Sequence, residues 1–251
     1  MRQVVVVFWV WTLLSVGGPL ATAQRPARKT ILDGVFSATQ ATQGKASFVM
    51  QCSSCHSEDL SGRSAPALKG PQFIDNWREY GLDTLFTYIK ENMPRGKDKL
   101  SEQTYIEILT HILEANEYPA GTSELTRDAI SAISFVGKDG PAQVPDNALV
   151  QIVGCLTQRD DGIWLFTRAT DPIRIRMGSE GKATQDELKA SAAEPLGSKT
   201  FRLVYPDFEA GFDVNSYKGQ KMVGKGYFLV NPTDQRLSIT WMGAVSDRCD
   251  Q

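Results

Sequence analysis

The sequence predicts an α+β protein of two domains, in which an all-α domain precedes a small all-β domain. From Ala41 to about Pro119, apolar residues recur at helical spacing. After Pro141 the period changes to two, and β-branched and aromatic residues become frequent. Between these regions, residues 137–145 (GKDGPAQVP) are rich in Gly and Pro, as domain boundaries are.

Composition supports this size of fold and excludes several classes of protein. The chain has 251 residues, of which 41% are hydrophobic and 22% are charged, so it is long enough for two cores and is not a disordered chain. The formal net charge is −2. Net charge therefore gives no reason to bind nucleic acid or an anionic membrane.

The first residues predict export. Arg2 precedes an apolar run from Val4 to Val16, and Ala21-Thr22-Ala23 follows as a cleavage site. A membrane-spanning helix needs about 20 apolar residues, so residues 1–23 are expected to be a signal peptide, with an uncleaved anchor as the alternative. Residues 24–40 are expected to be a tether, and the mature chain is expected in the bacterial periplasm, where thiols can be oxidised.

Three helices are expected in the first domain, over residues 41–121. Thr42 can cap a helix that runs to Cys52, and apolar residues from Leu82 to Ile89 mark a second helix. Ser101 is expected to cap the N-terminus of the longest helix, which should end before Pro119.

Residues 122–145 are expected to be a linker, and residues 146–251 a β domain with one helix capped by Thr184. With five strands, this domain resembles an oligonucleotide-binding-type (OB-like) barrel in outline, and we interpret it as a docking or structural module. Lys218, Lys221 and Lys225 are expected on a solvated strand face, so no nucleic acid is expected as a partner. The expected strands are Leu149–Thr157, Ile163–Arg168 with an extension to Ile175, Thr200–Tyr205, Lys221–Val230 and Arg236–Val245.

The strongest chemical signal is CSSCH, from Cys52 to His56. Two thiols on one helical turn, Cys52 and Cys55, can each add to a vinyl group of the same haem, and the adjacent imidazole of His56 is then held against the iron. A thioredoxin-like dithiol, half of a zinc site and a structural disulfide are the alternatives. A redox dithiol belongs in a βαβ setting and a zinc site needs further ligands, and the sequence shows neither.

An electron-carrying haem needs a second axial ligand, and a methionine thioether raises its reduction potential. Met50 precedes Cys52 so closely that it is confined to the proximal side of the haem. Met177, Met222 and Met242 belong to the β region. Met93 lies in a breaker-rich loop that could present its side chain across the haem. His111 is the rival candidate, but its mid-helix position favours a hydrogen-bonded or surface histidine.

These residues together resemble a class I cytochrome c domain of the type found with periplasmic quinoprotein dehydrogenases. The resemblance covers residues 41–121, and Gly44 stands for the glycine at which the first and last helices of such domains meet. It implies that Pro66 supplies the carbonyl that orients the proximal histidine, that Phe73 and Trp77 contact the haem, and that His56 and Met93 ligate the iron. Its matching positions are Phe48, Ala65-Pro66-Ala67-Leu68, Phe73, Trp77, Met93-Pro94 and the stretch from Tyr105 to Gly121.

The resemblance implies one covalent haem c and one-electron transfer from a periplasmic dehydrogenase, such as a quinoprotein, to a respiratory acceptor, without catalysis of its own. Two alternatives remain. One is a haem enzyme that acts on a small oxidant such as peroxide, which requires an open iron site. The other is a structural or docking subunit of a larger redox complex.

Cys155 and Cys249 lie on the first strand and just after the last strand of the predicted barrel. In a closed barrel these positions can be neighbours, and in an oxidising compartment the two thiols are expected to pair. The alternative is two unpaired thiols.

Overall fold

The computed structural model describes residues 28–231 and 233–249. The predicted signal peptide lies outside the described residues. Within them, no helix combines the length and apolar character needed to cross a membrane.

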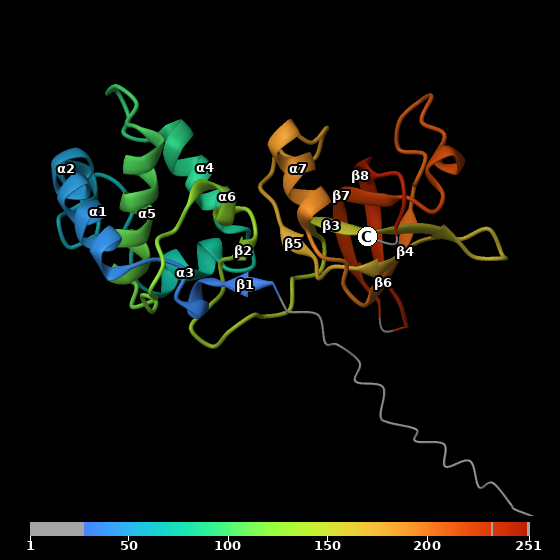
Figure 1. The fold of residues 1–251 in the computed structure, drawn as a ribbon, viewed down its shortest axis with the longest axis horizontal. Coiled ribbons are helices and arrows are strands. Elements are labelled where there is room, and N and C mark those ends of the chain that lie inside the picture. Colours follow the sequence, from blue (N-terminus) through green and yellow to red (C-terminus); the bar gives the residue numbers. More distant parts are fainter. Residues whose placement is uncertain (1–27, 232, 250–251) are drawn as a thin grey trace, which may run out of the picture.

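The first part of the chain is helical, and its helices surround one hydrophobic core (Figure 1). The α-helix that carries the CSSCH motif follows directly on the first long helix. The elements of this part are β1 (Lys29–Thr30), η1 (Ile31–Asp33), α1 (Ala38–Gln51), α2 (Ser53–His56), α3 (Pro71–Trp77), α4 (Leu82–Asn92), α5 (Glu102–Ala115), α6 (Arg127–Ile130) and β2 (Ile133–Ser134).

Side-chain caps set where the long helices begin. Ser101 caps α5, as predicted, by accepting a hydrogen bond from the Thr104 amide at 3.1 Å. The predicted cap of α1 was wrong, because Ser37 and not Thr42 accepts the hydrogen bond from the Gln40 amide at 3.1 Å. Thr42 lies inside the helix, where its hydroxyl donates back to a carbonyl of the preceding turn.

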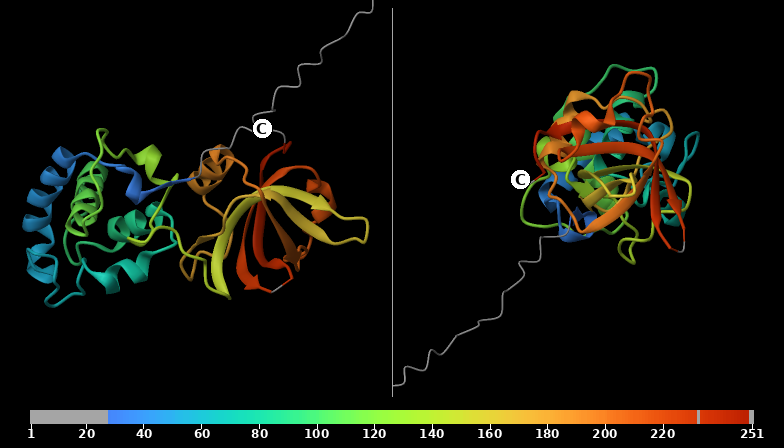
Figure 2. Two further views of the ribbon diagram at one scale, coloured as in Figure 1. Left: turned by 90° about the horizontal axis from the view of Figure 1, so that it is seen from below. Right: turned by 90° about the vertical axis from the view of Figure 1, so that its right-hand side faces the viewer.

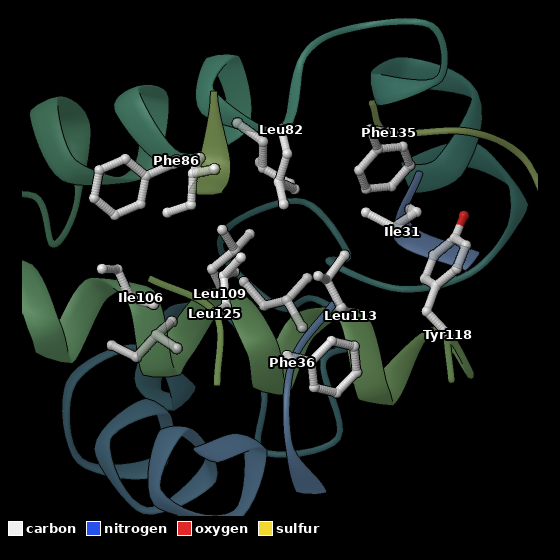
Figure 3. Close-up of a cluster of buried hydrophobic side chains, with 14 of the residues drawn as sticks. Ile31, Phe36, Leu82, Phe86, Ile106, Leu109, Leu113, Tyr118, Leu125 and Phe135 are labelled. Carbon is white, nitrogen blue, oxygen red and sulfur yellow. The ribbon is translucent and has the colours of Figure 1, made fainter. Parts of the chain in front are cut away.

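The helical core extends beyond both predicted boundaries, so the described part of the expected tether and much of the expected linker are packed. β1 and β2 pair in parallel and join the two flanks of the domain. Ile31 and Phe36, from the expected tether, are fully buried. Figure 3 shows both in one cluster with Leu125 and Phe135, from the expected linker, against the side chains of α4 and α5.

The second part is a closed five-stranded barrel, which confirms the predicted fold class. Its strands are hydrogen-bonded in the order β3-β4-β6-β8-β7 and back to β3, and β5 is added outside β3. All pairs are antiparallel except β6 with β8. The elements are β3 (Ala148–Gln158), β4 (Trp164–Ala169), β5 (Ile173–Arg174), α7 (Gln185–Ala193), β6 (Lys199–Val204), η2 (Val214–Tyr217), β7 (Lys221–Val230) and β8 (Gln235–Ser246).

Helix α7 covers part of the barrel, and this overturns the expected solvated face of β7. Lys221 and Lys225 are only 4% and 2% exposed. The Lys225 ammonium lies 2.9 Å from the Glu187 carboxylate of α7, and the Lys221 ammonium donates to the carbonyls of Ala192 and Glu194 at its end. Both charges are paired or hydrogen-bonded, as buried charges must be. Lys218 is exposed, as expected.

The helical part and the barrel lie side by side, with β5 and α7 between them (Figures 1 and 2). Arg174 of β5 donates its amide to the Glu79 carbonyl at 2.8 Å, and its guanidinium lies 4.4 Å from the centre of the Tyr80 ring. Arg176 lies over Tyr88 at 4.6 Å and over Trp77 at 5.2 Å. Arginine–aromatic stacking therefore forms much of this joint.

Helices α1 and α5 cross with their backbones in contact at Gly44. A Cβ atom at Gly44 would lie 1.8 Å from the Glu107 carbonyl oxygen, which is a severe overlap with backbone. Phe48, one turn later, is fully buried against the ring of His111 on α5, at 5.4 Å between ring centres. The packing role that the resemblance gave to Gly44 is therefore present.

We expect Gly44→Ala to lower the free energy of unfolding by about 3 kcal/mol, because the added methyl forces the two backbones apart. Urea denaturation of the full chain measures this effect. Gly181→Ala is the matched control, since a Cβ atom there would meet nothing within 4 Å. Equal stability of the two variants would contradict the close crossing.

His111 differs from the expected hydrogen-bonded or surface histidine. It is 6% exposed, and neither ring nitrogen has a hydrogen-bond partner among the described residues. Burial, together with the charge of Lys45, lowers the pKa of His111 below its ordinary value. Burial therefore favours the neutral form of this imidazole in the folded protein.

This burial makes the stability of the protein dependent on pH. Unfolded histidine takes up a proton near pH 6.5, whereas folded His111 does so only at lower pH, so stability is lost as the pH falls below about 6.5. We expect His111→Phe to keep the contact with Phe48 and to remove this loss. The free energy of unfolding of the unaltered chain should therefore fall between pH 8 and pH 5 relative to that of His111→Phe, so that at pH 5 the variant is as stable or more stable. A difference that does not change with pH would show that His111 does not titrate in this way.

Candidate functional site

The two cysteines of the motif lie on one turn at the end of α1. Cys52 ends α1 and caps α2, and its carbonyl accepts hydrogen bonds from the amides of Cys55 at 3.2 Å and His56 at 3.0 Å. Neither thiol is in a disulfide. Cys52 is half-buried and packs against the helical core, whereas Cys55 is exposed.

The two thiols differ in acidity. Burial raises the pKa of the Cys52 thiol to about 11, although the charge of Lys97 opposes this rise. Hydrogen bonds from Ser64 and Ser54 lower the pKa of Cys55 from its ordinary value. Cys52 is thus held as a neutral thiol facing apolar side chains, and Cys55 is the more reactive of the pair.

The imidazole of His56 is oriented by the carbonyl oxygen of Pro66. The Nδ1 atom lies 2.8 Å from this oxygen, and because a carbonyl can only accept, Nδ1 carries the proton. Nε2 then has a free lone pair, and no hydrogen bond within the described residues engages it. A buried imidazole whose Nδ1 is fixed by a carbonyl is the usual arrangement of a histidine that ligates a metal through Nε2.

A short loop, residues 57–68, places the Pro66 carbonyl. The Gly62 amide donates to the His56 carbonyl at 2.9 Å, and the Ala65 amide donates to the Cys55 carbonyl at 3.1 Å. Gly62 has φ +86°, and a Cβ atom there would lie 2.8 Å from the Ala67 amide nitrogen. The loop therefore folds back tightly onto the motif, and a larger residue at Gly62 would strain it.

Asn116 anchors the far end of this loop, and the sequence did not single it out as a site residue. Its side-chain amide donates to the carbonyls of Leu68 and Ile112 at 2.8 Å, and its oxygen accepts from the Gly70 amide at 3.0 Å. Asn116 is only 4% exposed. Its place just after the end of α5, where a side chain can bond the free carbonyls, was the available signal.

The loop that carries Met93 lies beside the motif. Met93 ends α4 and is half-buried, and its carbonyl accepts from the Tyr105 hydroxyl at 2.6 Å. Lys97, four residues later, lies 3.5 Å from the Gln51 carbonyl at the end of α1. Figure 1 shows this α4–α5 loop at the end of the helical part that also carries α2. Sequence reasoning did not identify Lys97 or Tyr105 as residues that hold the loop there.

The remaining candidates lie in an aromatic cluster of the helical core. Phe73 and Trp77 are 4% and 8% exposed, with ring centres 6.4 Å apart. Trp77 also lies 5.5 Å from Tyr88, and Phe73 lies 6.1 Å from Phe135. The structure explains both residues as core, and their contact with a haem stays a prediction. Met50 points to solvent and is 69% exposed.

The residues present suit a covalently bound haem. Two free thiols and an imidazole with an available Nε2 share one turn, and apolar side chains border that turn. A zinc ion would need further ligands, and the described residues contain no group of three or more His, Cys, Asp or Glu side chains that could hold a metal.

Cys155 and Cys249 lie far from this site, on the barrel. Their Cα atoms are 5.5 Å apart and the two residues are placed as a disulfide pair, 94 residues apart in sequence. This geometry agrees with the predicted pairing across the closed barrel.

Comparison with known proteins finds a similarity in the helical part. Residues 39–112 match the family model of cytochrome c oxidase, cbb3-type, subunit III. No curated protein and no solved structure matches the chain significantly. The match begins in α1, includes the CSSCH turn and ends in α5. It supports a cytochrome c family for the helical part, and with it a covalently bound haem c and a role in electron transfer.

Proposed function

We propose that this protein is an exported c-type cytochrome that carries one electron between a periplasmic dehydrogenase and a respiratory acceptor. The observation that carries this proposal is the geometry of His56, a buried imidazole fixed by the Pro66 carbonyl on the same turn as two free thiols. A carrier of this kind makes and breaks no substrate bonds.

Cys52, Cys55 and His56 would hold the cofactor. Each thiol would add its S–H across one vinyl group, so that sulfur bonds to carbon and the hydrogen goes to the neighbouring carbon. His56 would donate the Nε2 lone pair to the iron, while the Pro66 carbonyl keeps the proton on Nδ1. The bound haem c would supply a one-electron couple between ferrous and ferric iron.

Met93 is proposed as the second axial ligand. Its support is the position of its loop, which Lys97 holds against the end of α1 and Tyr105 holds through the Met93 carbonyl. A thioether favours the ferrous state and leaves no open position for a small oxidant, so it suits a carrier better than an enzyme. Phe73 and Trp77 are proposed to contact the same cofactor.

The cellular setting of the proposal comes from the sequence. Residues 1–23 have the pattern of a signal peptide, which suggests export to the periplasm, and a Cys155–Cys249 disulfide is compatible with that compartment. A quinoprotein dehydrogenase is the proposed type of donor.

The covalent link is tested on a reducing denaturing gel. The mature chain, made in a host that matures c-type cytochromes, should keep haem peroxidase staining, and Cys52→Ala with Cys55→Ala should lose it. Cys155→Ala with Cys249→Ala is the matched control and should stain like the unaltered chain. A colourless band from the unaltered chain would exclude covalent haem.

The second ligand is tested by Met93→Ala. We expect the haem to stay attached, the reduction potential to fall, and carbon monoxide to bind the reduced protein, because the sixth position opens. Redox titration and absorption spectra measure these changes. Met50→Ala and His111→Ala are the controls, since Met50 points to solvent and His111 packs against Phe48. An unchanged potential and spectrum in Met93→Ala would assign the ligand to another residue.

A further inference from the structure

The barrel carries a hollow of about 450 Å³, remote from the CSSCH turn. It lies on β4 and β6, the second and third strands of the barrel, between the β3–β4 loop and the β7–β8 loop. Barrels of this topology bind ligands on the corresponding strands and loops. Figure 1 shows the β3–β4 hairpin at the end of the molecule opposite α2. The lining residues are Arg159, Ile163, Leu165, Thr200, Arg202, Thr233, Asp234 and Gln235.

Two carboxylates beside this hollow are hydrogen-bonded to neighbouring arginines. Asp161 accepts from Arg159 Nε at 2.9 Å and from Arg159 Nη2 at 2.6 Å, and it also accepts from the Ile163 amide. Asp234 accepts from Arg236 Nε at 2.9 Å and 3.0 Å through its two oxygens, and this bond holds the pKa of Asp234 below its usual range. The carboxylates of Asp161 and Asp234 are therefore already paired with Arg159 and Arg236.

Arg202, on β6, is different from these two arginines. Its closest ionic contact is 4.0 Å from Nη1 to Asp234 Oδ2, which is too long for a hydrogen bond. Within the described residues its guanidinium donates no hydrogen bond, and the side chain is 42% exposed. Asp234 is already held by Arg236, so the donors of Arg202 remain available to a ligand in the hollow.

The chemistry of the lining selects the class of ligand. A guanidinium can pair with a planar carboxylate through two parallel hydrogen bonds. The hydroxyls of Thr200 and Thr233 and the amide of Gln235 can bond ligand hydroxyl groups, and Ile163 and Leu165 add a small apolar surface. Among the described residues no aromatic side chain lines the hollow, so this lining offers no platform on which single-stranded nucleic acids stack.

We propose that this hollow binds a carboxylate-bearing sugar, a uronic acid unit, with Arg202 paired to the carboxylate. The threonine hydroxyls and Gln235 bond the ring hydroxyls, and the apolar side chains contact a C–H face of the ring. The unit could come from a free sugar acid or from an acidic polysaccharide, since both present the same group. This site is independent of the proposed electron transfer, because no residue of the CSSCH turn contributes to it.

The test is a calorimetric titration of the full haem-loaded chain with D-galacturonate, D-galactose and trigalacturonate. We expect saturable binding of galacturonate and at least tenfold weaker binding of galactose, because the neutral sugar leaves Arg202 unpaired. Trigalacturonate that binds more tightly than galacturonate identifies a polysaccharide as the source, and equal binding identifies the free sugar acid.

Variants locate the binding to this hollow. Arg202→Gln should weaken galacturonate binding at least tenfold. The affinity of Arg202→Lys should lie between those of the unaltered chain and Arg202→Gln, since lysine keeps the charge but loses the paired donors. Lys189→Gln, on the exposed face of α7, removes the same charge elsewhere and should change nothing. Circular dichroism and thermal unfolding of each variant show that it is folded before it is titrated.

Three results would overturn the proposal. Galacturonate binding that survives in folded Arg202→Gln would place the site elsewhere. Galactose that binds as tightly as galacturonate would remove the role of the carboxylate. Acetate or phosphate that binds as tightly as galacturonate would leave a simple anion site without recognition of a sugar.

Discussion

The close crossing of α1 and α5 at Gly44 is the constraint on which the geometry of the helical part depends. Because no side chain separates the backbones there, α1 runs against α5 with little freedom to slide. The CSSCH turn continues from the end of α1, and the Met93 loop leads into the start of α5, so the crossing fixes the distance between these segments. The bonds of Lys97 to Gln51 and of Tyr105 to Met93 then complete an arrangement that the two helices have already set.

Regular elements of both domains could be predicted from the sequence, but the flanks of the helical core could not. Helix α5 and strand β7 show their periods within their own residues, and local capping chemistry marks where Ser101 begins a helix. Ile31 and Phe36 show no period, and they are buried where the two-residue strands β1 and β2 bring the two flanks of the domain together. A pairing between segments so far apart leaves no signal in either segment alone.

The same limit explains the errors about polar residues. Lys225 reads as a solvent-facing position of a strand, yet it is buried because α7, from another part of the chain, lies on that face and supplies Glu187. Residue type shows that a charge needs a partner, and it does not show where the partner lies. The motif residues were predictable for the opposite reason, because Cys52, Cys55 and His56 carry their spacing within a single turn. Asn116 and Lys97 bond the chain on either side of that turn, at the carbonyls of Leu68 and Gln51. These are tertiary contacts, which the sequence does not show.

The joint between the two parts has a different physical character from either core. Its contacts are guanidinium groups on aromatic rings, as with Arg176 over Trp77 and Tyr88, and ion pairs such as Arg28 with Glu194 at 2.7 Å. Interfaces of this polar kind depend on ionic strength more than buried apolar packing does. Trp77 belongs both to the aromatic cluster of the helical core and to this joint, so the guanidinium of Arg176 lies directly against an aromatic side chain of that core. The two parts are therefore joined by charged side chains that meet aromatic rings and carboxylates, although their two hydrophobic clusters are separate.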